Sequence, residues 1–387
     1  MPGTEVFTAG KLWFHNRKGR YSASFEYSRQ WLVHPDRFAL DPALVLTEGA
    51  FHTGNNQSLF GAIGDSLPDR WGRLLMQRAN TSGRNLTELD YLLGVNDELR
   101  QGALRFSETA GEYLSKGGKN SVPPLVKLPE LLSLTEKFLD NKATAEELRM
   151  LLIPGSSLGG ARPKASVMDN NGNLSIAKFP RKDDDTDIVR WEAVALTLAK
   201  TAGINTSEWR METILGKPAL LIKRFDRIGN ARIPFLSAMS MLEAGNDDQV
   251  YSYVDMANML QRHGAIPNKD RCELWRRMVF GILISNTDDH LRNHGFLFNK
   301  GRGWALSPAY DLNPSIDKTA FATAIDNTGA QNTVELALHN SDAFNLSKEQ
   351  AKKILDEVIS AVSGWRKIAK SFDIPARGIE RMKHAFK

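Results

Sequence analysis

Cysteine is nearly absent from this chain of 387 residues: the single Cys272 excludes an internal disulfide and a zinc site built on cysteine. Long apolar runs are absent too, and the N-terminal MPGTEVFTAGKLW lacks the basic and then apolar pattern of a signal peptide. No block of five or more like charges occurs, although the net charge is +5. We therefore expect a cytoplasmic protein without a membrane partner, whose mild positive charge permits contact with nucleic acid or an acidic protein without predicting either.

The composition is that of a globular protein, with 42% hydrophobic and 25% charged residues. A chain of this length can form two or three domains, or one large bilobal domain, around a substantial core. The polar segment 115–124, SKGGKNSVPP, contains glycines and ends in two prolines, so it is the clearest linker.

The N-terminal residues 1–110 are expected to be rich in β structure. A hairpin over 11–15 and 21–26 flanks the turn-rich NRKGR, and further strands are expected at 43–46 and 102–106. Asp65 or Ser66 is expected to cap a helix that runs through 73–78, and a short helix is expected at 87–93.

Helical periodicity dominates later in the chain. Helices are expected at 128–139, 144–152, 187–202, 237–243, 253–263, 269–284, 347–367 and 375–385. A T-x-E-E capping pattern opens the second of these, and Gly203 ends the third.

The stretch 285–315 carries residues that suit phosphotransfer. Asp288 and Asn293 stand in a D-x-x-x-x-N pattern, and Asp311 follows a predicted hairpin over 295–298 and 304–306. Phosphotransfer needs one carboxylate to accept the hydroxyl proton, and an amide and a second carboxylate to hold magnesium. Taken alone, acids and amides in a loop are more often solvated caps and turns, so the rest of the chain must decide.

A second stretch, 154–164, is a loop rich in glycine and serine that precedes a predicted hairpin over 165–168 and 174–179. Its glycines allow backbone N–H groups to approach phosphates, and Lys178 on the second strand can neutralise their charge. No G-K-[ST] follows the glycines, so this is not a Walker A loop. A surface turn with a solvated lysine is the simpler interpretation of this stretch alone.

Two further features complete the order of motifs that is typical of a protein kinase. Glu192 in the 187–202 helix could pair with Lys178, although an ordinary surface glutamate is an equal alternative. A hairpin over 208–214 and 219–225 ends at the position of a kinase hinge, where Lys223 and Phe225 could read adenine. Arg224 and Asp226 could as easily form a structural ion pair.

The order of glycine loop, lysine, glutamate, hinge, D-x-x-x-x-N and second acid predicts an α+β, bilobal, protein-kinase-like fold. It has a mixed α/β N-terminal lobe and a helical C-terminal lobe. We expect three parts: a β-rich subdomain at 1–114, the rest of the N-terminal lobe at 115–226, and the C-terminal lobe at 227–387.

The motifs differ from those of eukaryotic protein kinases, since NTDDHLRN and AYDLNP replace H-R-D and D-F-G. At these residues the chain resembles the HipA family of bacterial serine/threonine kinases, which are the toxins of toxin–antitoxin pairs. The resemblance covers nearly the whole chain and includes GDSLPDRWGR, GALRF, SSLGGARPK, KRFDR and NTDDHLRNHGF…LSPAYD.

This resemblance implies a role for individual residues. Asp288 would be the catalytic base, and Asn293 and Asp311 would be the magnesium ligands. The residues implied in ATP binding are Ser157, Leu158, Gly159, Gly160, Lys178, Lys223, Phe225, His290, Asn293, Tyr310 and Asp311. Ser157, or its neighbour Ser156, would be phosphorylated by the kinase itself, which switches the kinase off.

The resemblance also implies the cofactors ATP and Mg²⁺, and a HipB-like DNA-binding antitoxin through which the protein meets DNA indirectly. Family members cause growth arrest and persistence by phosphorylating aminoacyl-tRNA synthetases, so a translation component is the expected substrate.

Two other functions stay open. Asp288, Asp289, His290 and His294 could form the site of a metal-dependent hydrolase, although Asp289 and His294 are more often hydrogen-bonded supports. Alternatively, the chain could be a catalytically silent kinase fold that acts as a binding module or co-repressor.

Overall fold

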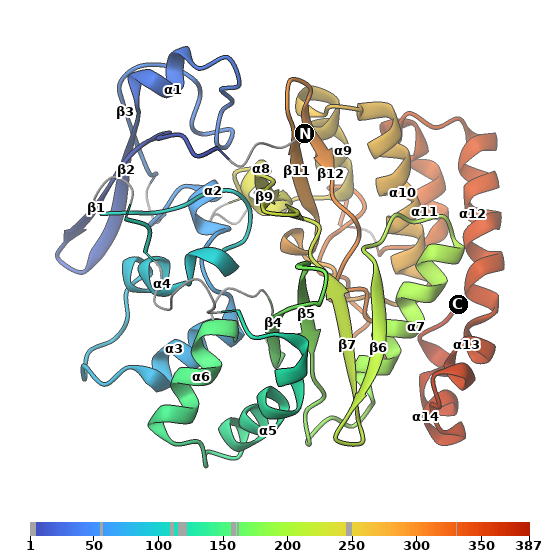
Figure 1. Cartoon of the computed structure of the whole chain (residues 1–387). Helices are drawn as coiled ribbons and strands as arrows, with labels where there is room; N and C mark the ends of the chain where they lie inside the picture. Colours follow the sequence, from blue (N-terminus) through green and yellow to red (C-terminus); the bar gives the residue numbers. More distant parts are fainter. Residues whose placement is uncertain are drawn as a thin grey trace. The chain divides into compact units, whose positions relative to one another are not determined.

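The computed structural model describes residues 5–54, 57–108, 112–114, 122–155, 160, 162–244, 250–329 and 331–387. The chain forms two compact units. Unit 1 comprises Met1–Lys182 and Met211–Leu236, and unit 2 comprises Asp183–Arg210 and Ser237–Lys387. Helices and antiparallel sheets are both present, so the protein is of the mixed α+β class (Figure 1).

The strands are short. They are β1 (Gly10–Arg17), β2 (Arg20–Tyr27), β3 (Ala50–His52), β4 (Lys164–Met168), β5 (Leu174–Lys178), β6 (Trp209–Ile214), β7 (Lys217–Lys223), β8 (Arg227–Ile228), β9 (Ala231–Arg232), β10 (Phe235–Ser237), β11 (Gly295–Asn299) and β12 (Gly303–Leu306).

The α-helices are α1 (Arg29–Val33), α2 (Gly61–Gly64), α3 (Arg70–Ala79), α4 (Glu88–Gly94), α5 (Leu128–Leu139), α6 (Ala145–Gly155), α7 (Ile188–Thr201), α8 (Ala238–Met241), α9 (Tyr253–His263), α10 (Pro267–Leu283), α11 (Val334–His339), α12 (Lys348–Ser363), α13 (Trp365–Ser371) and α14 (Ala376–Arg381). The 3₁₀ helices are η1 (Asp97–Leu99), η2 (Leu125–Lys127), η3 (Leu291–Asn293), η4 (Ser341–Phe344) and η5 (Met382–His384).

The expected N-terminal hairpin is confirmed. β1 and β2 pair in register from Gly10 opposite Tyr27 to Arg17 opposite Arg20. Lys18 and Gly19 form the turn and both have positive φ, +52° and +81°, as a two-residue hairpin turn of the I′ type requires.

Two expected strands are wrong. The segment 43–46 forms a turn, because Leu44 is fully buried and its carbonyl accepts a hydrogen bond from the Tyr27 hydroxyl. The segment 102–106 cannot start as a strand, because Gly102 has a φ of +72° and its N–H donates to Asp226. The conformation of each segment is set by contacts with residues that are distant in sequence. The apolar pattern of the segments themselves does not indicate those contacts.

The cap expected for the third helix is also wrong, although the helix itself is confirmed. Asp65 is the C-cap of the short helix α2, and α3 begins after Pro68 with Asp69 as its N-cap. The capping pattern expected at Thr144 is confirmed, since Thr144 exchanges hydrogen bonds with Glu147. The structure shows a further capping box at the start of α4, between Thr87 and Asp90.

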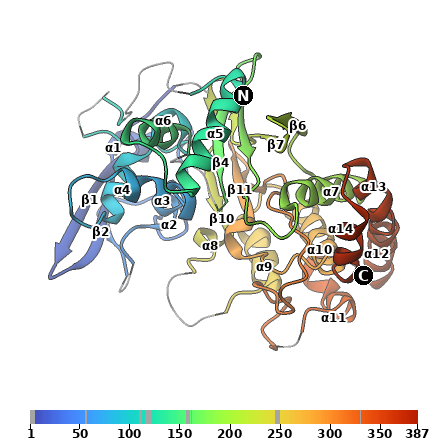
Figure 2. The same ribbon diagram turned by 90° about the horizontal axis from the view of Figure 1, so that it is seen from below.

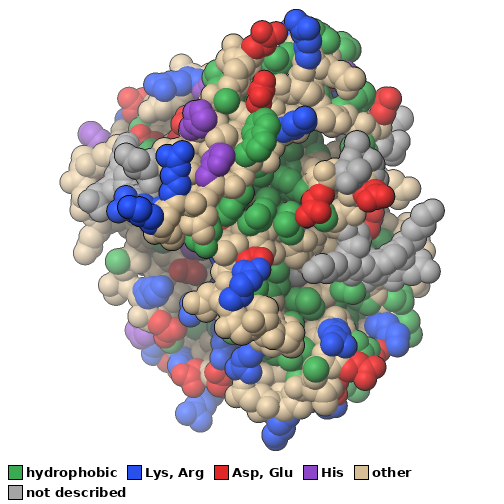
Figure 3. Space-filling model, turned by 90° about the vertical axis from the view of Figure 1, so that its left-hand side faces the viewer, with side chains coloured by type: hydrophobic (Ala, Val, Ile, Leu, Met, Phe, Trp, Pro, Cys, Tyr) green, Lys and Arg blue, Asp and Glu red, His purple; other side chains and the backbone are tan. Residues whose placement is uncertain are grey.

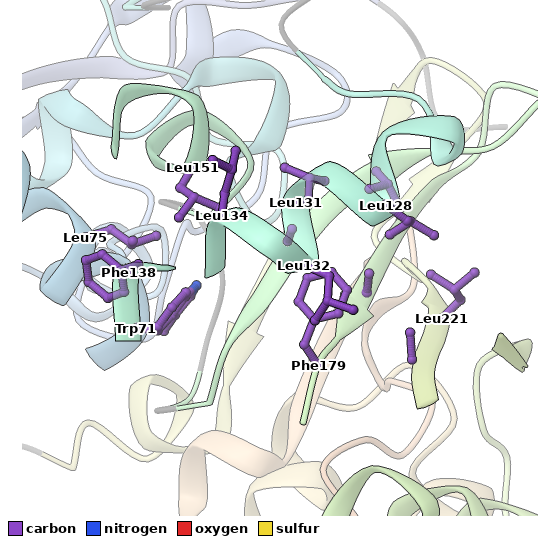
Figure 4. Close-up of a cluster of buried hydrophobic side chains, with 14 residues drawn as sticks. Trp71, Leu75, Leu128, Leu131, Leu132, Leu134, Phe138, Leu151, Phe179 and Leu221 are labelled. Atoms are coloured by element: carbon purple, nitrogen blue, oxygen red, sulfur yellow. The ribbon is translucent and has the colours of Figure 1, made fainter. Parts of the chain in front are cut away.

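The core of unit 1 lies between three helices and one sheet. The sheet has the order β4-β5-β7-β6, and α3, α5 and α6 contribute side chains to a single apolar cluster with its strands (Figure 4). Trp71 of α3 also donates its indole N–H to the carbonyl of Lys164 at 2.9 Å. Each large apolar side chain buried here contributes about 1.5–3 kcal/mol, so this cluster stabilises the packing of the three helices on the sheet.

The core of unit 2 is built around α10. This helix lies between α9 and α12 in both ribbon views and packs against both (Figures 1 and 2). Its buried side chains include Leu274, Trp275, Met278, Val279 and Ile282. The antiparallel hairpin of β11 and β12 follows, as expected from the sequence, with Phe296 opposite Leu306.

The helices confirm most of the periodic pattern. The segments expected at 128–139 and 253–263 coincide with α5 and α9. The long segment 347–367 is divided at Gly364 into α12 and α13. No helix in the described ranges is both long and apolar enough to cross a membrane.

Candidate active site

The candidate catalytic loop in unit 2 starts from the buried end of α10. Ser285 follows the C-cap of this helix with a φ of +51°, in the left-handed region, so the chain turns sharply there. The N–H of Asn286 donates to the carbonyl of Gly281 at 2.8 Å and satisfies one acceptor of the last helical turn. The loop therefore begins at a fixed point on a rigid helix.

Asp288 and Asn293 are held together by the backbone of this loop. The side-chain amide of Asn293 donates to the carbonyl oxygen of Asp288 at 3.0 Å, and the N–H of His290 donates to the same oxygen at 3.0 Å. Asn293 ends the short helix η3, and His290 is the N-cap of that helix. This hydrogen bond orients the amide of Asn293 so that its NH₂ group faces the loop.

The carboxylate of Asp288 points toward solvent, with 71% of its side chain exposed. The ammonium of Lys318 lies 3.6 Å from Asp288 Oδ1, and 64% of that side chain is exposed. An exposed pair of this kind contributes little to stability, typically about 0–1 kcal/mol. Lys318 was not among the residues indicated by the sequence, because it lies in a polar stretch without a motif.

Asp311 lies in a segment that is tied to the loop on both sides. The hydroxyl of Tyr310 donates to the carbonyl of Arg292 at 2.7 Å, and the N–H of Asn313 donates to Oδ1 of Asn286 at 3.2 Å. Asp311 itself has a φ of +54°, which is uncommon outside glycine. The fold of unit 2 thus brings the second acid beside the loop that carries the first.

A buried cluster supports the loop from inside. Asp289 accepts a hydrogen bond from the hydroxyl of Tyr253, and His294 Nε2 lies 3.3 Å from Asp289 Oδ1. The carbonyl of Asp289 accepts from the hydroxyl of Thr323 at 2.6 Å. Burial alone would raise the pKa of Asp289, but His294 and the Tyr253 hydroxyl outweigh it and hold that pKa below the usual range. Burial, reinforced by Asp289, raises the pKa of Tyr253, so the phenol is the donor.

This arrangement separates the residues proposed for a metal-dependent hydrolase. Asp288 and His290 are exposed, whereas Asp289 and His294 are buried and contact each other. Asp289 and His294 therefore support the loop through their contact with each other, which is the role that the sequence favoured for them. Within the described ranges, no group of three or more His, Cys, Asp or Glu side chains is arranged to hold a metal.

Magnesium does not require such a group. This small hard cation usually keeps several waters and is bound by one or two carboxylates together with phosphate oxygens. Asp311 offers one carboxylate, and Asn293 offers an amide oxygen on a side chain whose NH₂ group is already bonded. The chemistry of this pair of oxygen donors fits magnesium better than zinc.

The expected ATP-binding residues of the sheet lie in unit 1. Lys178 ends β5, the strand between β4 and β7, and is paired with Lys164 on one side and Leu220 on the other. Lys223 ends β7, and Phe225 follows it and contacts the ring of Phe235 at 6.2 Å between centroids. Because β5 and β7 are antiparallel, Lys178 pairs with Leu220 and Lys223 pairs with Ser175, so the two lysines lie at opposite ends of this strand pair. Their roles in ATP binding stay predictions.

Glu192, expected as a partner of Lys178, lies on α7 in unit 2 and is only 3% exposed. The alternative that it is an ordinary surface glutamate is therefore wrong. Its pairing with Lys178 stays a prediction.

The end of the glycine loop is attached to α3. Gly160 has a φ of +81° and donates its N–H to Asp69 Oδ2 at 2.5 Å, while its carbonyl accepts from the N–H of Trp71 at 3.1 Å. Asp69 and Trp71 belong to the GDSLPDRWGR motif, which the sequence did not connect with the loop. The other expected loop residues lie outside the described residues: Ser156, Ser157, Leu158 and Gly159.

The hinge segment is fixed by buried charges. Arg224 and Asp226 form an ion pair at 2.6 Å, which confirms the structural alternative for these two residues. Arg224 also donates to the carbonyl of Leu99 at 2.6 Å, and Asp226 accepts from the N–H of Gly102 and from Arg227, both at 2.8 Å. The hinge is thereby bonded to the N-terminal segment that contains the GALRF motif.

Comparison with known families gives one match. The family model of the HipA-like C-terminal domain matches residues 156–365, which is more than half of the chain. This range contains every residue expected to act in catalysis, metal binding or ATP binding, from Ser157 to Asp311.

Two curated proteins of Sinorhizobium fredii (strain NBRC 101917 / NGR234) are similar to the chain. One is named "Putative kinase Y4mE" and is 24% identical over 322 residues, which cover 74% of this chain and 71% of that protein. The other is named "Putative kinase Y4dM" and is 30% identical over 185 residues, which cover 40% of this chain and 44% of that protein.

Among solved structures, the chain is similar to the Shewanella oneidensis MR-1 toxin–antitoxin system of HipA, HipB and its operator DNA. The TM-score is 0.66 at 17% sequence identity, and the match covers 97% of this chain and 92% of that chain. This likeness shows that the fold is that of HipA, over nearly the whole length of the chain.

Proposed function

Because the chain belongs to the family of the HipA-like C-terminal domain, we propose that it is a kinase that uses ATP to phosphorylate serine or threonine in a protein. The observation that carries this proposal is the loop in which Asn293 bonds to the backbone of Asp288 while the Asp288 carboxylate stays exposed. A base and an amide ligand fixed in one loop are what a phosphotransferase needs.

In the proposed reaction, Asp288 accepts the proton of the substrate hydroxyl as that oxygen attacks the terminal phosphate of ATP. Asn293 and Asp311 would hold Mg²⁺, which supplies positive charge to the phosphates when bound. Lys318, 3.6 Å from Asp288, is a further cation that can offset negative charge beside the base.

On unit 1, Lys178 would contact the phosphates, and Lys223 and Phe225 would hold the adenine. His290 and Tyr310 would complete the nucleotide site from the catalytic loop and from the segment bonded to it. The N–H groups of Leu158 and Gly159 would approach the phosphates. Gly160, whose N–H donates to Asp69, would hold the end of the loop at the nucleotide site.

We place self-inactivation at Ser157, with Ser156 as the neighbouring acceptor. A phosphoserine carries close to two negative charges, so it would be repelled by the phosphates of ATP and would leave the nucleotide site. The attachment of Gly160 to Asp69 and Trp71 supports this, because it fixes one end of the loop.

The proposed biological role is that of a toxin with a HipB-like antitoxin as partner, through which the chain would meet DNA. Support comes from the fold of a HipA that was solved with HipB and operator DNA. The proposed substrate is a translation component such as an aminoacyl-tRNA synthetase, whose phosphorylation would cause growth arrest.

The test is incubation of the protein with labelled ATP, magnesium and a cell lysate. Removing a general base costs about 10²–10⁴-fold in rate, so Asp288→Asn should lose nearly all label on the chain itself and on lysate proteins. Asp317→Asn, which removes another exposed acid of unit 2, is the control and should keep the label. Mapping the label on the chain tests Ser157 against Ser156.

Label that persists in the Asp288→Asn protein would contradict the role of this residue. If the wild-type protein shows no label that depends on Asp288, the kinase proposal is wrong, and the chain would be a silent kinase fold that binds partners.

A further inference from the structure

Two segments of unit 1 bring five arginines into one group, called the arginine cluster below. Its members are Arg100, Arg105, Arg224, Arg227 and Arg232. The two segments are bonded directly, because the guanidinium groups of Arg224 and Arg227 donate to the carbonyl of Arg100 at 3.2 and 2.5 Å. None of these arginines is among the residues proposed for catalysis or ATP binding.

The arginine cluster holds more positive charge than the acids around it neutralise. Among the described residues, the carboxylates that contact its guanidinium groups are those of Asp97, Glu98 and Asp226. Five cations against three anions leave a surplus of two positive charges. By contrast, on the face of the molecule drawn in Figure 3, Lys and Arg side chains are interspersed with Asp and Glu.

Arg100 shows where this surplus is felt. It is fully buried, and its guanidinium group donates to the carbonyl oxygens of Ser66, Leu92 and Val95. These acceptors are neutral, as is the ring of Phe106 that the guanidinium group lies over. Burial lowers the pKa of Arg100 to about 10, against the opposing effect of Asp97, and the charge of Arg232 lowers it further. A buried cation with so little compensation is costly, so the fold gains from an anion nearby.

The arginine cluster reaches solvent at Arg105 and Arg232, whose side chains are 20% and 12% exposed. Glu98 stands at this edge, with its carboxylate 3.6 Å from the guanidinium group of Arg232 and 4.0 Å from that of Arg105. Both distances are longer than a hydrogen bond, and 53% of the Glu98 side chain is exposed. Glu98 is therefore a loosely held counterion that a stronger anion can replace.

A phosphate dianion suits this edge in charge and in geometry. A phosphate group with one or no ester bond carries about 1.5 to 2 negative charges at pH 7, which matches the surplus of two. The planar fork of a guanidinium group is suited to two oxygens of one phosphate. Arg105 is also held before any anion binds, because Asp97 accepts from its Nε at 2.9 Å and the ring of Tyr113 lies 3.5 Å from its guanidinium carbon. Less freedom is then lost when an anion binds.

We propose that the edge formed by Arg105 and Arg232 binds a phosphate dianion in the place now held by Glu98. The dianion is either free phosphate or the phosphate group of a phosphorylated side chain, since both present the same charge and oxygens. This site is separate from the proposed phosphotransfer, because its three residues have no part in catalysis or ATP binding. It does not require the chain to be a kinase.

The test follows thermal unfolding of the full-length protein while inorganic phosphate replaces chloride at constant ionic strength. A ligand that binds only the folded state raises the midpoint of unfolding, and the dependence on phosphate concentration gives the Kd. Two variants should act in opposite directions: Glu98→Gln removes the competing carboxylate, and Arg232→Gln removes a cation of the site. The matched control is Glu88→Gln, which removes a partly buried acid from its ion pair with Arg73 in the same unit.

We expect Glu98→Gln to bind phosphate about two- to fivefold more tightly than the wild type, as loss of a partly exposed competing charge implies. Arg232→Gln should bind about tenfold more weakly or worse, because it loses charged hydrogen bonds. The control should stay within about twofold of the wild type. If Arg232→Gln fails to fold, Glu98→Gln still decides, because a general loss of structure would not tighten binding.

Further measurements separate the sites and the sources of phosphate. Lys178→Gln alters the proposed nucleotide site and should keep the affinity of the wild type for phosphate. A short peptide with phosphoserine, beside its unphosphorylated form, identifies the source: tighter binding than inorganic phosphate assigns the site to a phosphorylated side chain, and weaker binding assigns it to free phosphate. Stabilisation by phosphate that is absent in the wild type, unchanged in Glu98→Gln or lost in Lys178→Gln would overturn the proposal.

Discussion

At the scale of single residues, the neighbouring acids Asp288 and Asp289 have opposite surroundings. Asp288 is exposed and can meet a substrate, whereas Asp289 is buried between Tyr253 and His294. Since Asp289 and His294 stand on either side of the segment from His290 to Asn293, their contact closes that segment into a fixed loop. One acid is placed for chemistry, and the other fixes the position of the first.

We therefore predict that Asp289→Asn slows the kinase without weakening ATP binding. Loss of a hydrogen-bonded support of this kind typically costs about 10–100-fold in activity. The expected result is a fall of that size in kcat with a KM for ATP that stays within about twofold, measured by steady-state phosphorylation.

Asp317→Asn is the charge-matched control and should leave both constants unchanged. Tyr253→Phe keeps the buried ring and removes only its hydrogen bond, so it should also lower kcat. This variant replaces Asp289→Asn in the test if Asp289→Asn fails to fold. Equal changes in kcat and KM in both variants would indicate a general loss of structure and would contradict the positioning role.

At the scale of elements, the segment between β7 and β8 is bonded to the chain near η1. Asp226 is buried beside Arg224 and Arg227 and also accepts the N–H of Gly102. Burial alone would raise the pKa of Asp226, but the two arginines outweigh it and hold the pKa well below the usual range. The ionised carboxylate of Asp226 is thus one of the groups that join the N-terminal segment to the hinge.

We predict that Asp226→Asn destabilises the protein by about 3–5 kcal/mol, because two buried arginines lose their anion. Since the folded-state pKa of Asp226 is depressed, its stabilising effect is complete above the unfolded pKa of about 3.9 and is lost as the pH falls through the folded value. The difference in free energy of unfolding between wild type and variant should therefore be constant above about pH 5 and narrow below about pH 4.

Urea denaturation at several pH values measures this difference. The exposed ion pair of Lys182 and Asp140 supplies a control, because Asp140→Asn should leave the free energy of unfolding close to that of the wild type. A difference between wild type and Asp226→Asn that does not change with pH would show that the carboxylate acts through its shape and hydrogen bonds alone.

At the scale of the whole molecule, the chain passes between the two units three times, so unit 1 is not one continuous segment. Its sheet depends on this path. β5 pairs on one side with β4, which precedes it closely in sequence, and on the other with β7, which the chain reaches only after passing through α7 of unit 2.

We predict that a fragment of residues 1–182 does not fold cooperatively, whereas a fragment of residues 1–236 retains the sheet. The shorter fragment lacks β7, so the edge of β5 and part of the apolar cluster around Leu132 would be exposed. Far-UV circular dichroism and urea unfolding of both fragments measure this. A cooperative unfolding transition in the shorter fragment would contradict this prediction, because it would show that β4, β5 and the helices fold without β7.

The sequence alone determined the elements that depend on interactions between residues close together in the chain. The β1–β2 hairpin, α5, α9 and the capping pattern at Thr144 follow from alternation, periodicity and short-range hydrogen bonds. The sequence alone also showed the order of the glycine loop, Lys178, Asp288, Asn293 and Asp311, because a motif consists of particular residue types at fixed spacings. The division into 1–114, 115–226 and 227–387 stays a prediction.

Only the tertiary structure decided which segments meet. In the structure the segments 43–46 and 102–106 are not strands, the N-cap of α3 is Asp69, and Lys318 lies next to Asp288. Each of these depends on a partner that is distant in sequence, and a local pattern contains no information about that partner. Burial likewise separated Asp289 from Asp288, since two adjacent acids look alike until one of them loses its solvent.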